Sequence, residues 1–318
     1  MKKRLALLFA SLLLLTGCGK TTHDGPTVAA TTAPVYQFTL ALCQGTDIHV
    51  DQVISESVSC VHDYSLTVRQ MQALENADAV VISGAGLEDF MADAIGSKPT
   101  IDCSSGIELL CSEHDHDHAQ EAHGHEEEAH EEAEHDHEEE AHEEEDHHDH
   151  DHGEFDPHIW LDPENAMIMA QNICAGLSAL YPDQAEQLES NLQSLLGQLT
   201  ELQAYGQTVC ADLAVREMIT FHDGFGYLAE SLHLDILAAI EEEPGAEATA
   251  QELIHIIDLV QEHEVPVIFT EVNGSSSAAG VIHREIGTGI YTLDMGMSGA
   301  DYFDLMRKNY DTIKEALG

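Results

Sequence analysis

One acidic tract, residues 113–154, holds thirteen of the 22 histidines in this 318-residue chain. Imidazole nitrogen is the commonest neutral ligand of borderline divalent metals, zinc above all, and carboxylates add oxygen ligands and negative charge. Acidic low-complexity sequence is usually solvated and disordered, yet loosely held histidines can still capture an ion without a preformed geometry. We therefore predict that the tract is a disordered auxiliary metal loop, with ligands from His114, His116, His118, His123, His125, His130, His135, His137, His142, His147, His148, His150 and His152.

Five polar residues outside the tract have the types and positions of metal ligands. His62, His222, Glu271 and Asp294 come at or just after the ends of expected strands, and His158 follows the tract closely. In open parallel sheets, ligands bind beyond the carboxyl ends of the strands. Three histidines and one carboxylate would complete a tetrahedral zinc shell, although any one of these histidines alone is more often a structural residue. We interpret the other histidines as surface residues or local hydrogen-bond partners: His49, His233, His255, His263 and His283.

Expected strands alternate with expected helices on both sides of the tract. Before it, the pattern predicts strands at residues 37–42, 50–58, 78–82 and 99–102, and helices at 67–75 and 87–94. After it, strands are predicted at 218–221, 234–237, 265–270 and 289–293, and helices up to about 232 and at 247–262, 276–285 and 301–317. Such alternation is typical of βαβ units. We predict an α/β fold with two lobes, each with a roughly four-stranded parallel sheet and flanking helices.

A long helix is expected to join the two lobes. A first helix over about 162–180 starts with Asp162 as N-cap and Pro163 in its first turn. A second helix over about 184–213 carries a stripe of leucines with the 3.6-residue period. The predicted organisation is an N-terminal lobe over residues 36–182, a linking helix over 183–213 and a C-terminal lobe over 214–318.

The first 35 residues are interpreted as a targeting segment followed by a tether. A basic start precedes an eleven-residue apolar run, Leu5–Leu15, which is too short for a typical membrane span. The next residues complete Leu15-Thr16-Gly17-Cys18, which resembles a bacterial lipobox, where cleavage before the cysteine is followed by its lipidation. We predict a signal peptide over 1–18, lipid on Cys18 and a flexible tether over 19–35. The mature chain would lie outside the cytoplasm, anchored to the bacterial cell membrane by acyl chains.

The charge of the chain excludes one large class of partner. The formal net charge is −49, and no Lys or Arg occurs between Lys98 and Arg216. Such a surface repels phosphate backbones and attracts cations, so we predict that the chain does not bind nucleic acid.

The six cysteines besides Cys18 leave two alternatives open. Export would permit disulfides, but the sequence does not select a pairing, and free buried thiols are the other possibility. No C-x-x-C pair occurs, so a thiolate zinc site is not supported. The six residues are Cys43, Cys60, Cys103, Cys111, Cys174 and Cys210.

Several segments resemble the solute-binding proteins of ABC transporters for zinc and manganese, particularly the zinc-binding lipoproteins with a His-rich loop. Residues 61–67 (VHDYSLT), 156–163 (DPHIWLDP) and 220–228 (TFHDGFGYL) resemble the family's ligand segments, and residues 269–271 and 292–294 its closing pattern. The resemblance covers residues 36–316 and implies two α/β lobes joined by one long helix. It also implies His62, His158 and His222 as ligands, Asp294 as the fourth, and Glu271 as an alternative fourth ligand or a neighbour of the ligands.

The same resemblance implies a function. The chain would capture zinc outside the cytoplasm, as a monomer, and deliver it to an ABC permease. Manganese relatives place a carboxylate where His222 stands, and three imidazoles favour Zn²⁺ over Mn²⁺. The chain departs from the family before His62, where Val61 replaces the acidic neighbour that some zinc relatives use.

Three other functions were weighed against zinc transport. A manganese-binding transport protein would have the same fold, and a surface adhesin or passive metal buffer would need no permease. A zinc hydrolase is disfavoured because the sequence has no H-E-x-x-H, G-x-S-x-G or P-loop motif, and because a filled ligand shell leaves little room for an activated water. We therefore predict a protein that is not an enzyme.

Overall fold

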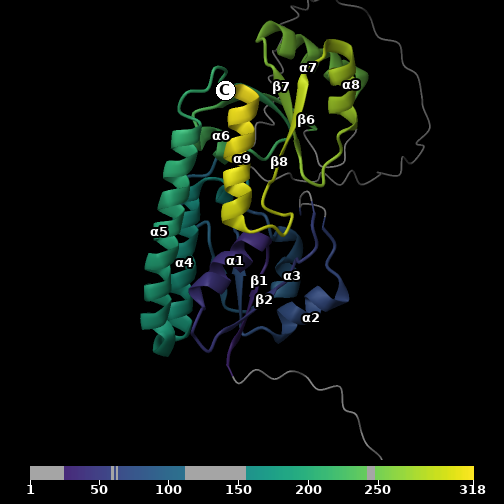
Figure 1. Ribbon diagram of the computed structural model, residues 1–318. Coiled ribbons are helices and arrows are strands. Elements are labelled where there is room, and N and C mark those ends of the chain that lie inside the picture. The colour runs from purple at the N-terminus through teal and green to yellow at the C-terminus, as the bar shows by residue number, and fades with distance from the viewer. Residues whose placement is uncertain (1–24, 59–60, 62–63, 112–154, 242–247) are drawn as a thin grey trace, which may run out of the picture.

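The computed structural model describes residues 25–58, 61, 64–111, 155–241 and 248–318. The described residues form two α/β lobes, one above the other in Figure 1. The predicted signal peptide with Cys18, the ligand His62, the residue Cys60 and the His-rich tract lie outside the described residues.

The N-terminal lobe is built on a parallel sheet with the strand order β2-β1-β3-β4. Short helices and one long helix, α4, surround this sheet (Figure 1). Its strands are β1 (Thr27–Ala30), β2 (His49–Gln52), β3 (Ala79–Ile82) and β4 (Thr100–Asp102), and its helices are α1 (Ala33–Leu42), α2 (Val68–Asn76), α3 (Ala92–Ile95) and α4 (Pro163–Leu180).

The C-terminal lobe repeats this arrangement with the order β6-β5-β7-β8, again parallel throughout. The predicted fold class, two lobes with four parallel strands each, is therefore confirmed. The strands are β5 (Glu217–His222), β6 (Asp235–Glu241), β7 (Val267–Glu271) and β8 (Gly289–Leu293), and the helices are α6 (Gly226–Ser231), α7 (Ala250–Glu262), α8 (Ser277–Ile286) and α9 (Tyr302–Leu317).

The start of the N-terminal lobe differs from the prediction. Residues 25–35 were assigned to the tether and 37–42 to a strand, but Thr27–Ala30 form the buried strand β1 and Ala33–Leu42 form the helix α1. Buried strands of a parallel sheet are short apolar runs without alternation, so TVAA was mistaken for linker sequence. In α1, Pro34 lies in the first turn, and Phe38 and Leu42 are buried at a helical spacing of four residues.

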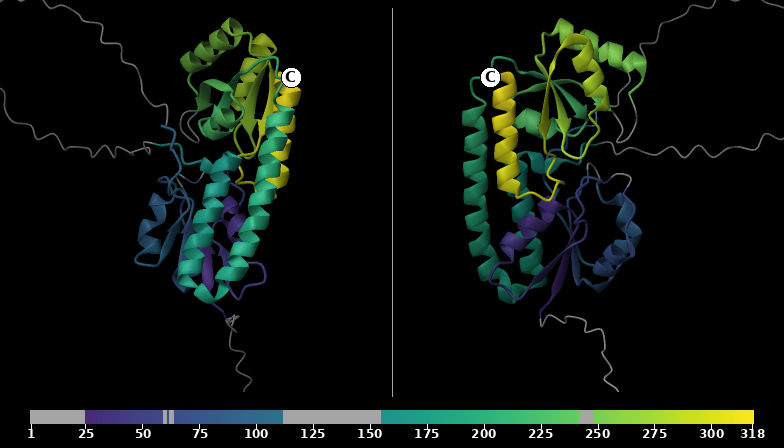
Figure 2. Two further views of the ribbon diagram at one scale, coloured as in Figure 1. Left: turned by 90° about the vertical axis from the view of Figure 1, so that its left-hand side faces the viewer. Right: turned by 45° about the vertical axis from the view of Figure 1, so that its right-hand side comes forward.

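The long helix α5 (Ala185–Val209) has 25 residues and is shorter than the predicted 183–213. It packs beside α4 and also contacts α1 and α9, and Figure 2 shows it running along both lobes. The leucine stripe faces this packing, because Leu188, Leu192, Leu195, Leu199 and Leu202 are all buried.

Two glycines of α5 allow a matched test of this packing. A Cβ on Gly206 would lie 2.7–3.0 Å from ring atoms of Tyr310 in α9, whereas a Cβ on Gly197 would have no neighbour within 4 Å. We expect Gly206→Ala to lower the free energy of unfolding by about 1–3 kcal/mol through overpacking. Gly197→Ala should raise it by up to about 1 kcal/mol, since alanine is the better helix former. Urea denaturation measures both, and equal effects would contradict the packing.

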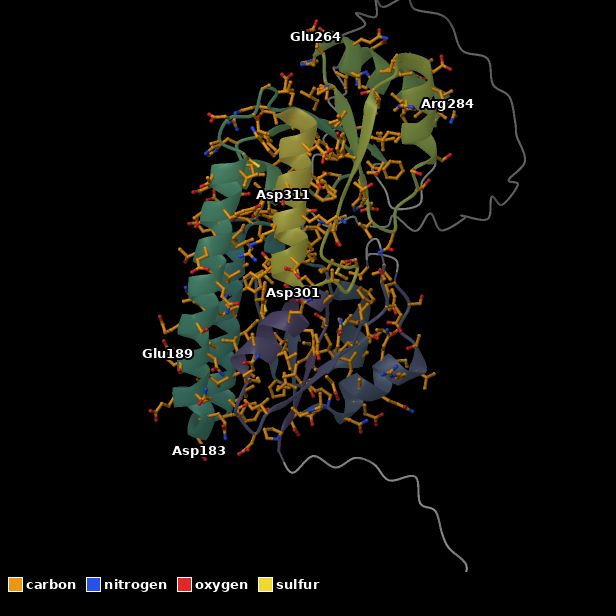
Figure 3. The ribbon with its side chains drawn as sticks, viewed as in Figure 1. Asp183, Glu189, Glu264, Arg284, Asp301 and Asp311 are labelled. Carbon is orange, nitrogen blue, oxygen red and sulfur yellow. The ribbon has the colours of Figure 1, made fainter. Side chains whose placement is uncertain are left out.

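The surface carries many acidic side chains, of which Figure 3 labels Asp183, Glu189, Glu264, Asp301 and Asp311. Asp301 caps the start of α9 by accepting hydrogen bonds from the backbone N–H groups of Phe303 and Asp304. Among the helices that the structure describes, none combines the length and the hydropathy needed to cross a membrane.

The described cysteines contain no disulfide. The five described cysteines are free, and the alternative of free buried thiols holds for all of them except Cys111, which is exposed: Cys43, Cys103, Cys111, Cys174 and Cys210. Burial raises the pKa of the Cys43 thiol to about 12 and that of Cys210 to about 11. These thiols therefore stay protonated at neutral pH and behave as small apolar side chains.

Candidate metal centre

Three of the predicted ligands lie at the carboxyl edge of the second sheet. His222 is the last residue of β5, Glu271 is the last residue of β7, and Asp294 directly follows β8. Because β7 pairs with both β5 and β8 in parallel, the three residues share one edge of the sheet. All three are buried.

The structure brings His158 and His222 together. His158 precedes the short 3-10 helix η2 (Ile159–Leu161), after which Asp162 caps α4. The centroids of the two imidazole rings lie 5.8 Å apart with the ring planes at 90°. The exposed fractions of His158 and His222 are only 2% and 3%. Two imidazoles from different lobes therefore lie close together at a site that is almost fully buried from solvent.

Asp156 fixes the orientation of the His158 ring. Its Oδ1 lies 2.8 Å from Nδ1 of His158 and also accepts a hydrogen bond from the His158 backbone N–H at 2.9 Å. A carboxylate on Nδ1 favours the tautomer with the proton on that nitrogen and leaves the Nε2 lone pair for a metal. Metal-binding histidines in proteins commonly have such a partner.

The Nε2 atom of His222 is buried and has no hydrogen-bond partner among the described residues. A buried polar atom without a partner costs about 1–3 kcal/mol, so such atoms are rare, and a bound ion is one of the features that explain them. This nitrogen is therefore suited to coordinate a metal ion.

Two glycines leave room for His158 and Asp156. A Cβ on Gly224 would lie 2.9 Å from Cε1 of His158 and 2.5 Å from Cε of Met295. A Cβ on Gly226 would lie 3.0 Å from Oδ2 of Asp156. The backbone φ of Gly224 is not positive, so this glycine serves to let the neighbouring side chains approach rather than to form a left-handed turn.

Buried hydrogen bonds tie the segment around His158 to the segment around Asp294. The indole Nε1–H of Trp160 donates to the Met295 carbonyl at 2.7 Å, and the Tyr302 hydroxyl donates to the Trp160 carbonyl at 2.7 Å. The rings of Trp160 and His158 are 5.5 Å apart. Candidate ligands from the two lobes are thus held together by protein contacts.

The complete predicted ligand set is not assembled among the described residues. No three His, Cys, Asp or Glu side chains within the described ranges are placed so that they could hold one metal ion. His62 lies outside these ranges, and the Asp294 carboxylate accepts hydrogen bonds from Gly296 N–H and Ser298 Oγ. Glu271 packs against Gly274, where a Cβ would lie 2.3 Å from its Cγ. The four-ligand shell therefore stays a prediction.

Asp156 is a functional residue that was not predicted as such, although its motif is visible in the sequence. Asp156 stands two residues before His158, and Asp-x-His spacing allows a carboxylate to reach Nδ1 of the histidine. No local signal marked Trp160 or Asn309, whose contacts join residues 135 and 15 positions apart. Ser298 lies only four residues after Asp294, but nothing in the sequence shows that its hydroxyl reaches that carboxylate.

Replacing Asp156 by Ala should weaken zinc binding by about 10–100-fold, the range typical for loss of a carboxylate that orients a metal-binding histidine. The imidazole would remain but would lose its fixed tautomer and direction. Competition with a chromophoric chelator measures the change. Asp156→Asn keeps one oxygen that can accept from Nδ1–H and should lose less; an Ala variant with wild-type affinity would contradict the orienting role.

The described residues that flank the His-rich tract pair with each other beside this centre. Cys111 and Phe155 form an antiparallel bridge, and the Asp156 N–H donates to the Leu110 carbonyl at 2.9 Å. The Tyr227 hydroxyl donates to the Asp156 carbonyl at 3.0 Å and accepts from the Leu110 N–H at 3.0 Å. The chain thus leaves for the tract and returns from it within a few residues of His158.

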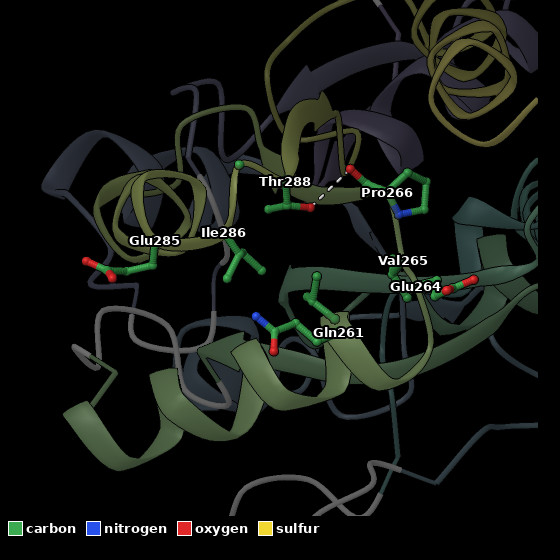
Figure 4. Close-up of a pocket in the computed structure, with 9 residues that line it drawn as sticks. Gln261, Glu264, Val265, Pro266, Glu285, Ile286 and Thr288 are labelled. Carbon is green, nitrogen blue, oxygen red and sulfur yellow. Dashed lines mark hydrogen bonds between the residues drawn. The ribbon is translucent and has the colours of Figure 1, made fainter.

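A separate pocket of about 420 Å³ lies at the opposite edge of the second sheet (Figure 4). Residues before β7 and β8 line it, among them Pro266 and Thr288, whose hydroxyl donates to the Pro266 carbonyl at 3.0 Å. Because His222, Glu271 and Asp294 are at the carboxyl ends of these strands, the pocket is not part of the candidate metal centre.

The model of the family described as zinc-uptake complex component A, periplasmic, matches residues 28–316. The zinc-binding lipoprotein AdcA of Streptococcus pneumoniae strain R6 is 29% identical over 335 residues, which cover 98% of this chain and 61% of that protein. This chain therefore spans about 61% of the length of that relative.

Two further similarities extend over nearly the whole of both chains. The high-affinity zinc uptake system protein ZnuA of Bacillus subtilis strain 168 is 29% identical over 335 residues, covering 98% of this chain and 97% of that protein. A solved crystal structure of ZnuA is similar with a TM-score of 0.74 at 26% identity, covering 93% of this chain and 100% of that chain. The family match starts at Val28, the second residue of β1, which agrees with the start of the first lobe seen in the structure.

Proposed function

Since this chain belongs to the zinc-uptake complex component A family, we propose that it is the extracytoplasmic zinc-binding component of an ABC-type importer. It captures the ion between its two lobes and presents it to a membrane permease. The zinc-binding names of the AdcA and ZnuA relatives support this proposal. The protein performs no catalytic step in this role, and zinc is its cargo.

The observation that carries the proposal is the pair of buried imidazoles. His158 and His222 come from different lobes, their rings are 5.8 Å apart, and Nε2 of His222 is buried without a described partner. Imidazole pairs suit zinc better than manganese, which prefers oxygen ligands. We therefore favour Zn²⁺ as the cargo, with Mn²⁺ as the weaker alternative.

The proposed ligands are His62, His158, His222 and Asp294, with Glu271 as the alternative carboxylate. The described residues just before His62 support its place at the same centre. Asn273 Nδ2 donates to the Ser57 hydroxyl at 2.7 Å, and the Val58 N–H donates to the Met297 carbonyl at 3.3 Å. The chain leading to His62 thus contacts the loops that follow β7 and β8.

The His-rich tract is proposed to be an auxiliary collector of metal. Its composition suits loose binding of zinc, and the described residues on either side of it, Cys111 and Phe155, pair with each other close to Asp156 and His158. An ion released from the tract would therefore have a short path to the centre. Unchanged zinc uptake at limiting zinc after removal of residues 113–152 would speak against this role.

The proposed organisation around the lobes follows from the sequence and the corrected fold. Residues 1–18 are a signal peptide, Cys18 carries lipid, and the tether ends before β1. The lipoprotein name of the pneumococcal relative supports the anchor. The N-terminal lobe, from β1 through α4, and the C-terminal lobe, from β5 through α9, are joined by α5.

Trp160 provides a direct test, because it is the only tryptophan in the chain and its ring lies 5.5 Å from that of His158. Zinc and manganese are titrated into the mature chain, with and without residues 113–152, and Trp160 fluorescence and heat are followed. We expect one tight zinc site with a Trp160 response in both chains, and weak manganese binding. If the tight site disappears with the tract, the centre between the lobes is not the zinc site and a metal buffer or adhesin is the better account.

A further inference from the structure

We propose that Asn309 and Ser298 are positioning residues that set the place and direction of the Asp294 carboxylate. The inference rests on the proposed function, since it takes Asp294 to be a zinc ligand. Neither residue is proposed to touch the metal. They restrict the orientation of the carboxylate before zinc binds, so that less conformational entropy is lost on binding.

Asn309 in α9 holds the main chain of Asp294 by two hydrogen bonds. Its Oδ1 accepts from the Asp294 N–H at 2.9 Å, and its Nδ2 donates to the Asp294 carbonyl at 2.8 Å. Asn309 is 1% exposed, so water does not compete for either bond. The side chain thus pairs with Asp294 as a neighbouring strand would, just where β8 has ended at Leu293.

The Asp294 carboxylate is held at both oxygens. The Gly296 N–H donates to Oδ1 at 2.8 Å, and the Ser298 hydroxyl donates to Oδ2 at 2.5 Å. Each carboxylate oxygen has two lone pairs, so one remains on each oxygen for a metal. Donors on both oxygens restrict rotation of the group, and a fixed direction is what a ligand from a short side chain requires.

Helix α9 connects this carboxylate to the first lobe. Tyr302, at the start of α9, donates to the carbonyl of Trp160, and Trp160 donates to the carbonyl of Met295. One helix therefore fixes both the segment that carries Asp294 and the segment that carries His158. The geometry between these two proposed ligands is then set before zinc binds.

Zinc affinity of four variants in the full mature chain tests the inference, with Trp160 fluorescence as the reporter of the centre. We expect Ser298→Ala to weaken zinc binding about tenfold and Asn309→Ala by up to about 100-fold. Ser298→Thr keeps the hydroxyl and should restore wild-type affinity. Ile313→Val trims a buried apolar residue of the same helix, four positions after Asn309, and should leave affinity unchanged.

A spectroscopic readout separates positioning from general loss of structure. Co²⁺ bound to the chain without residues 113–152 reports ligand geometry by its visible absorption. We expect Ser298→Ala and Asn309→Ala to change this spectrum, and Ile313→Val to leave it as in the wild type.

The outcomes distinguish the inference from the proposed function. If the wild-type chain shows no Trp160 response to zinc, the proposed function fails. If the wild type binds tightly but Ser298→Ala and Asn309→Ala bind within twofold of it, the positioning role is wrong. Should Asn309→Ala not fold, equal affinities of Ser298→Ala and Ser298→Thr would still overturn the role of the hydroxyl.

Discussion

Replacing His222 by Ala is expected to weaken zinc binding at the centre between the lobes by about 1,000-fold, equivalent to roughly 4 kcal/mol. The substitution removes a proposed ligand whose Nε2 is buried and has no hydrogen-bond partner among the described residues. Alanine offers no donor atom, and a water in its place would not match an imidazole held at the end of β5. Competition with a chromophoric chelator, in the chain without residues 113–152, measures the loss.

His255→Ala is the matched control, because His255 lies exposed on α7 and has the same side chain. Its variant should bind zinc as the wild type does. Zinc should also raise the thermal stability of the wild type and of His255→Ala, since a ligand at about 100 times its dissociation constant stabilises by roughly 2.7 kcal/mol. His222→Ala with the full zinc-induced shift would show that the ion binds elsewhere.

The meeting of His158 and His222 shows how far sequence alone could lead. Both the parallel sheet and the strand ending at His222 were predicted, and ligands of such sheets bind beyond the carboxyl ends. His158 was a candidate by its residue type and by its place after the tract, and the resemblance to metal solute-binding proteins supported it, but no periodicity could reveal its place beside a second lobe. The structure brings the two rings within 5.8 Å of each other.

The start of the first lobe shows where local patterns fail. TVAA, residues 27–30, contains small residues like those of a linker. Only its pairing with β2 on one side and β3 on the other shows that it is one of the two central strands of the sheet. That pairing joins residues about twenty and fifty positions apart, as Val28 does with Val50 and Ala79. Local sequence patterns do not show which distant segments will pair in a sheet.

The surroundings of Asp294 were hidden for a related reason. Asp294 itself could be predicted as the residue after a strand, but Asn309 lies fifteen positions later on α9. An asparagine on a helix is unremarkable until the helix packs and its amide meets a strand end. Positioning residues of this kind are set by tertiary packing, so a sequence with no structure shows the candidate ligands before it shows what orients them.

Glu88 forms a second buried hydrogen-bond cluster, at the carboxyl edge of the first sheet. Its Oε1 accepts from the Thr31 hydroxyl at 2.6 Å and from the Ser83 N–H at 2.7 Å, and its Oε2 accepts from the Gly84 N–H at 3.0 Å. Thr31 follows β1, and Ser83 follows β3. One carboxylate therefore joins the ends of two neighbouring strands in the lobe that carries His158.

Burial raises the pKa of Glu88 to about 7, against the lowering effect of these three hydrogen bonds. In the unfolded chain the Glu88 carboxyl has the ordinary glutamate pKa of 4.5. Between pH 4.5 and about pH 7, Glu88 therefore binds more protons in the folded state than in the unfolded state. The contribution of Glu88 to stability is therefore complete below about pH 4.5 and is lost as the pH rises through about 7. The loss amounts to roughly 3 kcal/mol.

Glu88→Gln removes this titration while keeping one oxygen for Thr31 and Ser83. Urea denaturation of the wild type and the variant between pH 4 and pH 8 should show that the wild type loses about 3 kcal/mol relative to the variant as the pH rises. The difference in the free energy of unfolding between the two proteins at each pH cancels the contributions of the other titrating groups. Glu189→Gln on α5 controls for the loss of one negative charge. A difference that stays constant across this range would mean that folding leaves the pKa of Glu88 unchanged, so that the three hydrogen bonds fully offset the effect of burial.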